Sequence, residues 1–134
     1  MNVLTNKKIV IKTSNKVFKP NLTTEMFVSY LFKLKFTKKK KILDLGCGTG
    51  AIGIYVKKKF KKKINLYMSD LSTHAVRSAI NNAKSNNIEC KIKKSNLFVG
   101  WVGQKFDIII NDVSAISYEI AKNSQWYNKY IPHN

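Results

Sequence analysis

The chain has 134 residues, of which 44% are hydrophobic, and its 25 Lys and Arg against 7 Asp and Glu give a formal net charge of +18. This length and composition predict one globular domain. No apolar run approaches the roughly 18 residues of a membrane-spanning helix, and the first residues lack the apolar core of a secretory signal, so we expect a cytoplasmic protein.

The positive charge permits two interpretations. Lysines that neutralise phosphates release counterions, which favours binding of nucleic acid at low salt. Every basic residue except Arg77 is a lysine, however, whereas arginine is the residue that makes bidentate contacts with phosphate or guanine. A solvated cationic surface is therefore the simpler interpretation, and binding of RNA or DNA stays open.

The two cysteines, Cys47 and Cys90, are too few for a disulfide framework. No second Cys or His lies within four residues of either cysteine, so the spacing does not match a zinc site. We expect neither a disulfide nor a bound metal.

Residues 1–40 predict an N-terminal appendage that consists of a hairpin and a helix. The runs 9–12 and 17–19 are β-like, and Thr23 or Thr24 can cap the helix that follows. The apolar positions of this helix recur at helical spacing, at Phe27, Leu31 and Leu34.

Strands and helices alternate from residue 41 onward. The expected strands are 42–45, 64–68, 88–92 and 106–110, and the expected helices are 50–60, 72–86 and one that passes through Ile116 and Ile120. Short apolar strands that alternate with amphipathic helices imply parallel pairing through right-handed crossovers. We therefore assign 41–134 to the α/β class, as a doubly wound, mostly parallel Rossmann-like sheet.

A glycine-rich turn, Asp44-Leu45-Gly46-Cys47-Gly48-Thr49-Gly50, follows the first of these strands and leads into a helix. Its glycines let the backbone approach a ligand closely. Gly48, Gly50 and Gly53 have the GxGxxG spacing of dinucleotide-binding folds, and Asp70 follows 20 residues after Gly50, so NAD is one candidate ligand. A carboxylate at position 44 repels a pyrophosphate and attracts an ammonium or a sulfonium, which favours S-adenosylmethionine over NAD.

Three of the four aspartates, Asp44, Asp70 and Asp112, follow predicted strands at their carboxyl ends. Ligands of open α/β sheets bind at that edge. The two carboxylate oxygens of Asp70 are expected to accept both hydroxyls of a ribose. Asp107 lies at the start of a strand and receives no role.

The segment Ile42-Leu43-Asp44-Leu45-Gly46-Cys47-Gly48-Thr49-Gly50 resembles the first motif of the class I S-adenosylmethionine-dependent methyltransferases, and the resemblance covers about 17–117. Within that superfamily the chain is most similar to the protein-glutamine methyltransferases that modify release factors. This closer similarity rests on Pro20 with Thr24-Glu25, on the helix start Gly50-Ala51-Ile52-Gly53, and on Asn96-Leu97-Phe98.

The resemblance implies a set of cofactor contacts. Asp70 would hold the ribose, Leu71 would pack on the adenine, and Asn96 with Leu97 would contact the edge of the adenine. The family usually has Asp at position 96, so Asn96 keeps an acceptor oxygen and loses a charge. The methionine part of the cofactor would lie on the residues of the turn, which are Asp44, Gly46, Cys47, Gly48, Thr49 and Gly50.

The chain departs from this branch after the fourth strand, where the branch carries Asn-Pro-Pro-Tyr and this chain reads Asp112-Val113-Ser114-Ala115. Asp112 takes the Asn position and is the predicted catalytic residue, because a carboxylate can orient a nucleophile or accept its proton. A glutamine acceptor is not implied, so we expect a protein or an RNA as methyl acceptor. A non-catalytic module that binds the cofactor or RNA, and an NAD-dependent oxidoreductase, are the alternatives.

The resemblance further implies a sheet of seven strands, and we expect strands five to seven to be missing from this chain. The chain would then be a natural short form, a fragment of a longer protein, or a domain whose exposed edge a partner covers. Because an unpaired strand edge promotes aggregation, we expect something to cover it. The candidates are a partner, a second copy of the chain, or the aromatic tail with Trp126, Tyr127 and Tyr130, which could alternatively stack on a substrate base.

Overall fold

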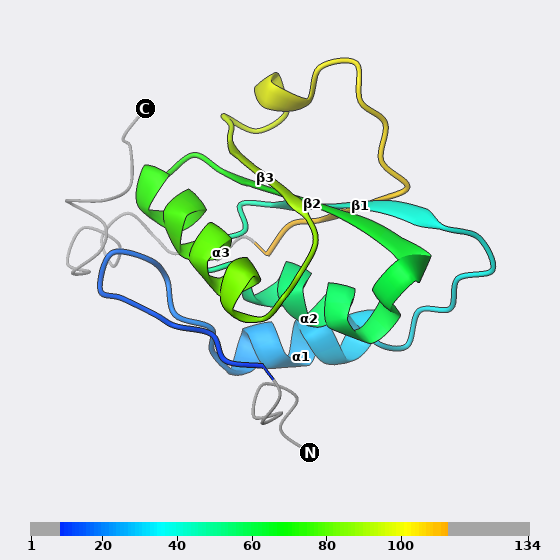
Figure 1. The fold of residues 1–134 in the computed structure, drawn as a ribbon, viewed down its shortest axis with the longest axis horizontal. Helices are drawn as coiled ribbons and strands as arrows, with labels where there is room; N and C mark the ends of the chain where they lie inside the picture. Colours follow the sequence, from blue (N-terminus) through cyan, green and yellow to red (C-terminus); the bar gives the residue numbers. More distant parts are fainter. Residues whose placement is uncertain (1–8, 113–134) are drawn as a thin grey trace.

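The computed structural model describes residues 9–112 (Figure 1). The expected helix through Ile116 and Ile120 and the aromatic tail lie outside these residues. None of the helices in the described part is long and apolar enough to cross a bilayer. The elements in chain order are α1 (Leu22–Leu31), β1 (Lys40–Leu45), α2 (Ala51–Phe60), the 3-10 turn η2 (Lys61–Lys63), β2 (Ile64–Asp70), α3 (Thr73–Ser85), β3 (Lys91–Lys94), the 3-10 turn η3 (Val99–Trp101) and β4 (Ile108–Ile110).

The four strands form one parallel sheet in the order β3-β2-β1-β4. In this sheet Asp44 of β1 lies opposite Ile110 of β4, and Leu45 lies opposite Ser69 of β2. The carboxyl ends of β1, β2 and β4 therefore meet at one edge, and the strand order reverses beside β1. This topology confirms the expected α/β, Rossmann-like fold class.

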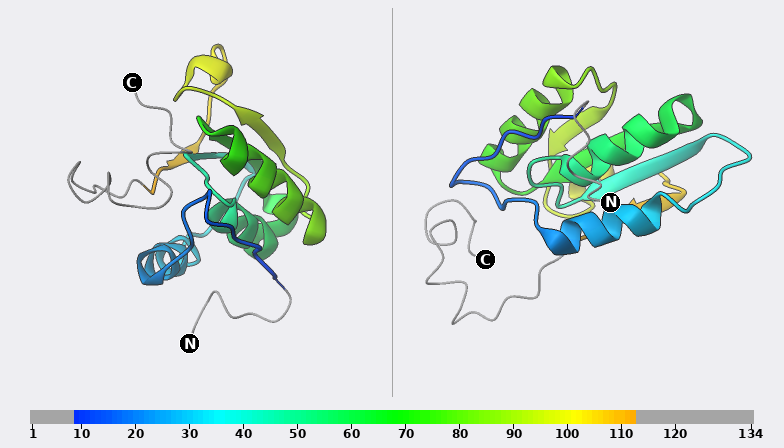
Figure 2. Two further views of the ribbon diagram at one scale, coloured as in Figure 1. Left: turned by 90° about the vertical axis from the view of Figure 1, so that its left-hand side faces the viewer. Right: turned by 90° about the horizontal axis from the view of Figure 1, so that it is seen from below.

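The three α-helices lie on one face of the sheet, below it in Figure 1, with α1 against α2 (Figures 1 and 2). Ile42 and Met68 on this face are fully buried against Ile54 of α2 and Ala79 of α3. On the opposite face a smaller cluster forms around Trp101, whose indole N–H donates to the Ser69 hydroxyl oxygen at 3.0 Å. The members of this cluster are Leu43, Leu45, Tyr67 and Trp101, with Phe106 packed against them.

Helix α1 is capped by Asn21 rather than by the expected Thr23 or Thr24. The Asn21 side-chain oxygen accepts from the Thr24 N–H at 3.2 Å, and the Thr24 hydroxyl oxygen accepts from the Asn21 N–H at 3.3 Å. This reciprocal pair satisfies two N–H groups that a helix start leaves without partners.

Residues 9–20 do not form the expected hairpin, since no strand is assigned within them. The N–H groups of Val10 and Lys12 donate to the side-chain oxygens of Asn86 and Asn82, both at 2.9 Å. The same two asparagines donate back to the carbonyl oxygens of Val10 and Lys12, at 2.9 and 3.0 Å. An amide side chain carries both a hydrogen-bond donor and an acceptor. Asn82 within α3 and Asn86 at its C-terminal cap therefore each pair with the N–H and the carbonyl oxygen of one residue of the segment, as a neighbouring strand would.

Two strands start later than the sequence predicts. The chain before β3 is still closing helix α3, because the Ile88 N–H donates to the Ala83 carbonyl oxygen at 2.9 Å. Before β4, Asp107 caps the edge of β1, where its carboxylate accepts from the Lys41 N–H at 2.7 Å. β3 therefore begins at Lys91 and β4 at Ile108.

Candidate functional site

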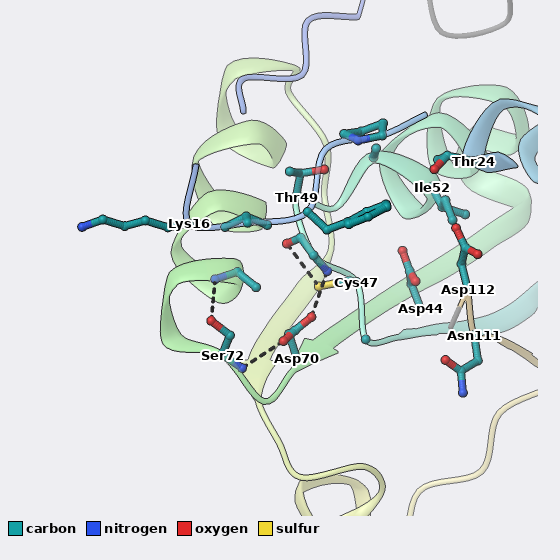
Figure 3. Close-up of a pocket in the computed structure, with 17 residues that line it drawn as sticks. Lys16, Thr24, Asp44, Cys47, Thr49, Ile52, Asp70, Ser72, Asn111 and Asp112 are labelled. Carbon is teal, nitrogen blue, oxygen red and sulfur yellow. Dashed lines mark hydrogen bonds between the residues drawn. The ribbon is translucent and has the colours of Figure 1, made fainter. Parts of the chain in front are cut away.

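A cavity of about 300 Å³ lies where β1, β2 and β4 end (Figure 3). The glycine turn, the three strand ends and the segment before α1 supply its walls, and all three strand-end aspartates line it. Its lining residues are Lys16, Val17, Phe18, Pro20, Thr24, Asp44, Gly46, Cys47, Gly48, Thr49, Ala51, Ile52, Asp70, Ser72, Ala75, Asn111 and Asp112.

Asp44 is the most deeply placed carboxylate of the cavity, with 2% of its surface exposed. Its Oδ2 accepts a hydrogen bond from the Gly53 N–H, in the first turn of α2, at 3.0 Å. Burial raises the pKa of this carboxyl from 3.8 to about 7, the Gly53 bond lowers it, and the charges of Asp70 and Asp112 raise it. A cation bound beside Asp44 would favour its ionised form.

The same bond bears on the choice between a cationic ligand and a dinucleotide. In dinucleotide-binding folds the pyrophosphate takes the N–H groups at this helix start. Here the Gly53 N–H is already donated to a buried carboxylate. A second anion would lie next to Asp44, so the geometry disfavours NAD.

The turn is held by backbone hydrogen bonds and presents few side chains to the cavity. The N–H groups of Gly46 and Cys47 both donate to the Ser69 carbonyl oxygen, at 2.8 and 2.9 Å. Gly50 does not line the cavity; it faces α3, where an added Cβ would lie 3.1 Å from the Ala79 Cβ. Cys47 is buried, and its burial raises the pKa of the thiol well above the usual value, so it serves as a small neutral wall.

Asp70 ties the glycine turn to the start of α3. Its Oδ2 accepts from the Gly48 N–H and its Oδ1 from the Ser72 N–H, both at 2.9 Å, as Figure 3 shows. Each carboxylate oxygen has a second acceptor position, so both oxygens can still receive hydroxyl groups of a ligand.

Asp112 and Asn111 extend the site beyond β4. Asp112 is half-buried, and in Figure 3 its carboxylate lies on the side of the cavity formed by Ile52 and Thr24, whereas Asn111 points the other way. Sequence reasoning assigned no role to Asn111. Its place directly after β4, at the edge where strand ends gather, was the available signal.

Three predicted adenine contacts lie outside the cavity lining. Leu71 is half-buried directly after Asp70, while Asn96 and Leu97 are exposed, Leu97 to 63%. The segment that carries the last two begins beside Asp70, because the Ser95 N–H donates to the Asp70 carbonyl oxygen at 2.9 Å. These three residues therefore lie at the same edge of the sheet as the cavity, but they do not cover the cavity.

Sequence reasoning missed the wall that the N-terminal segment provides. Val17 is buried, and its Cγ1 lies 3.9 Å from the position of a Cβ on Gly48. The buried Asn82 connects the segment to the turn, since its side-chain N–H₂ donates to the carbonyl oxygens of Lys12 and Thr49, both at 3.0 Å. Pro20 and Thr24 were noticed in the resemblance, but no periodic pattern predicts that they reach the cavity.

The model of one protein family, described as the methyltransferase small domain, matches residues 8–112. A ribosomal RNA small subunit methyltransferase C from Pasteurella multocida is 38% identical over 54% of this chain and 21% of its own length. A release factor glutamine methyltransferase from Streptococcus pneumoniae is 30% identical over 81% of this chain and 38% of its own length. The crystal structure of a ribosomal protein L11 methylase from Lactobacillus delbrueckii superposes with a TM-score of 0.60 at 26% identity, over 69% of this chain and 47% of that one.

Proposed function

Since the chain belongs to the methyltransferase small domain family, we propose that it binds S-adenosylmethionine in the cavity and transfers the methyl group to a protein or an RNA. The observation that carries this proposal is the gathering of Asp44, Asp70 and Asp112 around a turn of glycines. The cofactor carries an ammonium and a sulfonium, and a carboxylate-rich cavity attracts both.

The proposed contacts follow the order of residues along the sheet edge. The methionine part lies on the turn, with its positive charges toward Asp44, on Gly46, Cys47, Gly48 and Thr49. Gly50 shapes this turn from behind, since it packs on Ala79. Asp70 accepts the ribose hydroxyls with the acceptor positions that Gly48 and Ser72 leave. The adenine extends past the cavity over Leu71, toward Asn96 and Leu97.

The proposed mechanism asks for orientation and desolvation more than for covalent chemistry. The bound cofactor supplies a methyl carbon on a sulfonium, which is already a good leaving group. Ile52, Val17 and Phe18 line the cavity and exclude water from the acceptor side. Asp112 orients the attacking nitrogen or oxygen and takes its proton late in the reaction.

The acceptor class is supported by the relatives, whose names specify ribosomal RNA in one case and a release factor in another. The chain spans less than half of each of these relatives, at 21% and 38% of their lengths. The further strands that the resemblance implies would pair with β4, one of the two edge strands of the described residues. We include in the proposal a partner or a second copy that covers this edge, and a cytoplasmic site of action.

Transfer of a labelled methyl group from S-adenosylmethionine to cell extract tests the proposed activity. We expect labelled product that disappears after treatment with either nuclease or protease, which also names the acceptor class. The altered sequence after β4, Asp112 to Ala115, specifically favours the second candidate, a cofactor-binding or RNA-binding module without activity. Cofactor binding with no transfer to any acceptor would establish that candidate instead.

A further inference from the structure

A second cavity, of about 260 Å³, lies between the N-terminal segment and helix α3. We name it the basic cavity. Its lining contains no carboxylate and no aliphatic side chain among the residues that the structure describes. Its cationic and polar groups include Lys12, Lys16, Arg77, Ser14, Ser78 and Asn81.

The chemistry of this lining matches a phosphate. A phosphate diester needs positive charge and hydrogen-bond donors, and hydroxyl, amide, ammonium and guanidinium groups supply both. Arg77 is the single arginine of the chain, and its planar guanidinium can hold two phosphate oxygens at once. A peptide partner anchored by an apolar side chain would be expected to meet aliphatic side chains, and none lines this cavity among the described residues.

The basic cavity adjoins the cofactor cavity through two residues. Lys16 lines both, and Figure 3 shows its side chain extending away from Asp44 and Asp70. Asn82 lies between the two, because its side chain bonds Lys12 on one side and the carbonyl oxygen of Thr49 on the other. A phosphate bound in the basic cavity is therefore next to the proposed site of methyl transfer.

We propose that the basic cavity binds a backbone phosphate of an RNA strand and so positions a neighbouring nucleotide at the cofactor cavity. This inference rests on the proposed function, and it selects RNA over protein as the acceptor. The proposal concerns a local site and not the general positive charge of the surface. The two can be distinguished because the lysines of η2 lie at the opposite end of α2 from the glycine turn.

The test compares two double variants that each remove two positive charges from exposed side chains. The first, Lys12→Gln with Arg77→Gln, changes the basic cavity and leaves the backbone bonds of Lys12 to Asn82 in place. The matched control, Lys62→Gln with Lys63→Gln, changes η2. Binding of a labelled single-stranded RNA is followed by fluorescence anisotropy at several salt concentrations.

We expect the basic-cavity variant to bind RNA at least about tenfold more weakly. Its slope of log affinity against log salt should fall by about 0.7, because the variant loses one phosphate contact and each such contact on a single strand contributes about 0.7. The control should change affinity by less than about twofold. Equal losses of RNA affinity in both variants would show that the overall positive charge, and not the basic cavity, binds the RNA, and would overturn the proposal.

Two further measurements complete the test. Inorganic phosphate at the concentration of RNA phosphates should not displace the RNA; displacement would assign the cavity to a free anion. S-adenosylmethionine should bind equally to both variants and to the unmodified chain. A variant that loses RNA binding but keeps cofactor binding would then be defective in the basic cavity and not in the cofactor cavity. Failure of the unmodified chain to bind the cofactor would refute the proposed function instead, and a purely protein acceptor would overturn the choice of RNA.

Discussion

Replacing Asp44 by asparagine should make the folded chain more stable at neutral pH while it abolishes cofactor binding. The carboxyl is buried, and burial raises its pKa from 3.8 to about 7. Moving a pKa over that range corresponds to at most about 4 kcal/mol of free energy, which the folded chain loses on ionising this group. The amide oxygen introduced at position 44 can still accept from the Gly53 N–H, and the amide carries no charge that burial must desolvate.

The sign of the pH dependence follows from the same values. Between pH 3.8 and about 7 the folded chain keeps a proton on Asp44 that the unfolded chain has released. The contribution of this group to stability therefore falls as the pH rises through that window and stays constant above it. The stability difference between the Asp44→Asn variant and the unmodified chain should grow from about pH 4 to pH 7.

Urea unfolding of both chains at several pH values measures this difference. We expect the variant to be more stable by about 1 to 4 kcal/mol at pH 8, with near equality at about pH 4. Asp70→Asn is the matched control, because it removes the same charge from a carboxylate whose two oxygens both accept backbone N–H groups. This control should lose about 1–2 kcal/mol. A variant at position 44 that is less stable at every pH would refute the electrostatic reasoning.

Three other substitutions test separate parts of the site, and a fourth, Gly103→Ala, is a control. Asp70→Ala should abolish cofactor binding in a calorimetric titration, and unchanged affinity would remove Asp70 from the site. Asp112→Ala should leave cofactor affinity within about twofold and lower turnover at least about a hundredfold, the range expected for loss of a general base; equal turnover would contradict its catalytic role. Gly50→Ala should lose about 2–3 kcal/mol in urea unfolding, since φ is +80° and the Cβ would press on Ala79 at 3.1 Å. Gly103→Ala, at φ +78° with no atom within 4 Å, should lose only about 1 kcal/mol, and equal losses would show that the contact with α3 is unimportant.

The sheet and the glycine turn were predictable because their signals are local. A few consecutive residues are enough to recognise an apolar strand such as 64–68 or the glycine-rich run from Asp44 to Gly50. The expected membership of the S-adenosylmethionine-dependent methyltransferases is confirmed by the family match over residues 8–112. The gathering of the strand-end aspartates also follows from topology, since parallel strands that end at one edge bring those residues together.

The N-terminal segment was mispredicted because its partners are far away in the sequence. Lys12 bonds to Asn82 over 70 positions and Val10 bonds to Asn86 over 76. A β-like run looks the same whether its backbone groups pair with another strand or with amide side chains of a helix. The sequence alone therefore could not identify the two asparagines as partners of this segment; the packing of the segment on α3 was needed.

The glycines show a second limit of pattern reasoning. Gly50 and Gly53 satisfy a ligand-binding spacing, yet both serve packing, Gly50 against Ala79 and Gly53 against Met68, whose sulfur lies 2.5 Å from an added Cβ. The spacing of glycines shows where side chains are absent, but it does not show which group fills the space beside each glycine. Here that space is taken by α3 and β2.

The affinity for S-adenosylmethionine at two pH values shows whether the carboxylates of the cavity hold a positively charged cofactor. Because the charged cofactor requires ionised Asp44, whose pKa is about 7, we predict calorimetric binding at pH 8 that weakens about tenfold at pH 6, with no binding of NAD at either pH. Equal affinity for S-adenosylmethionine at both pH values, or binding of NAD in its place, would contradict a carboxylate-lined cavity that holds a positively charged donor.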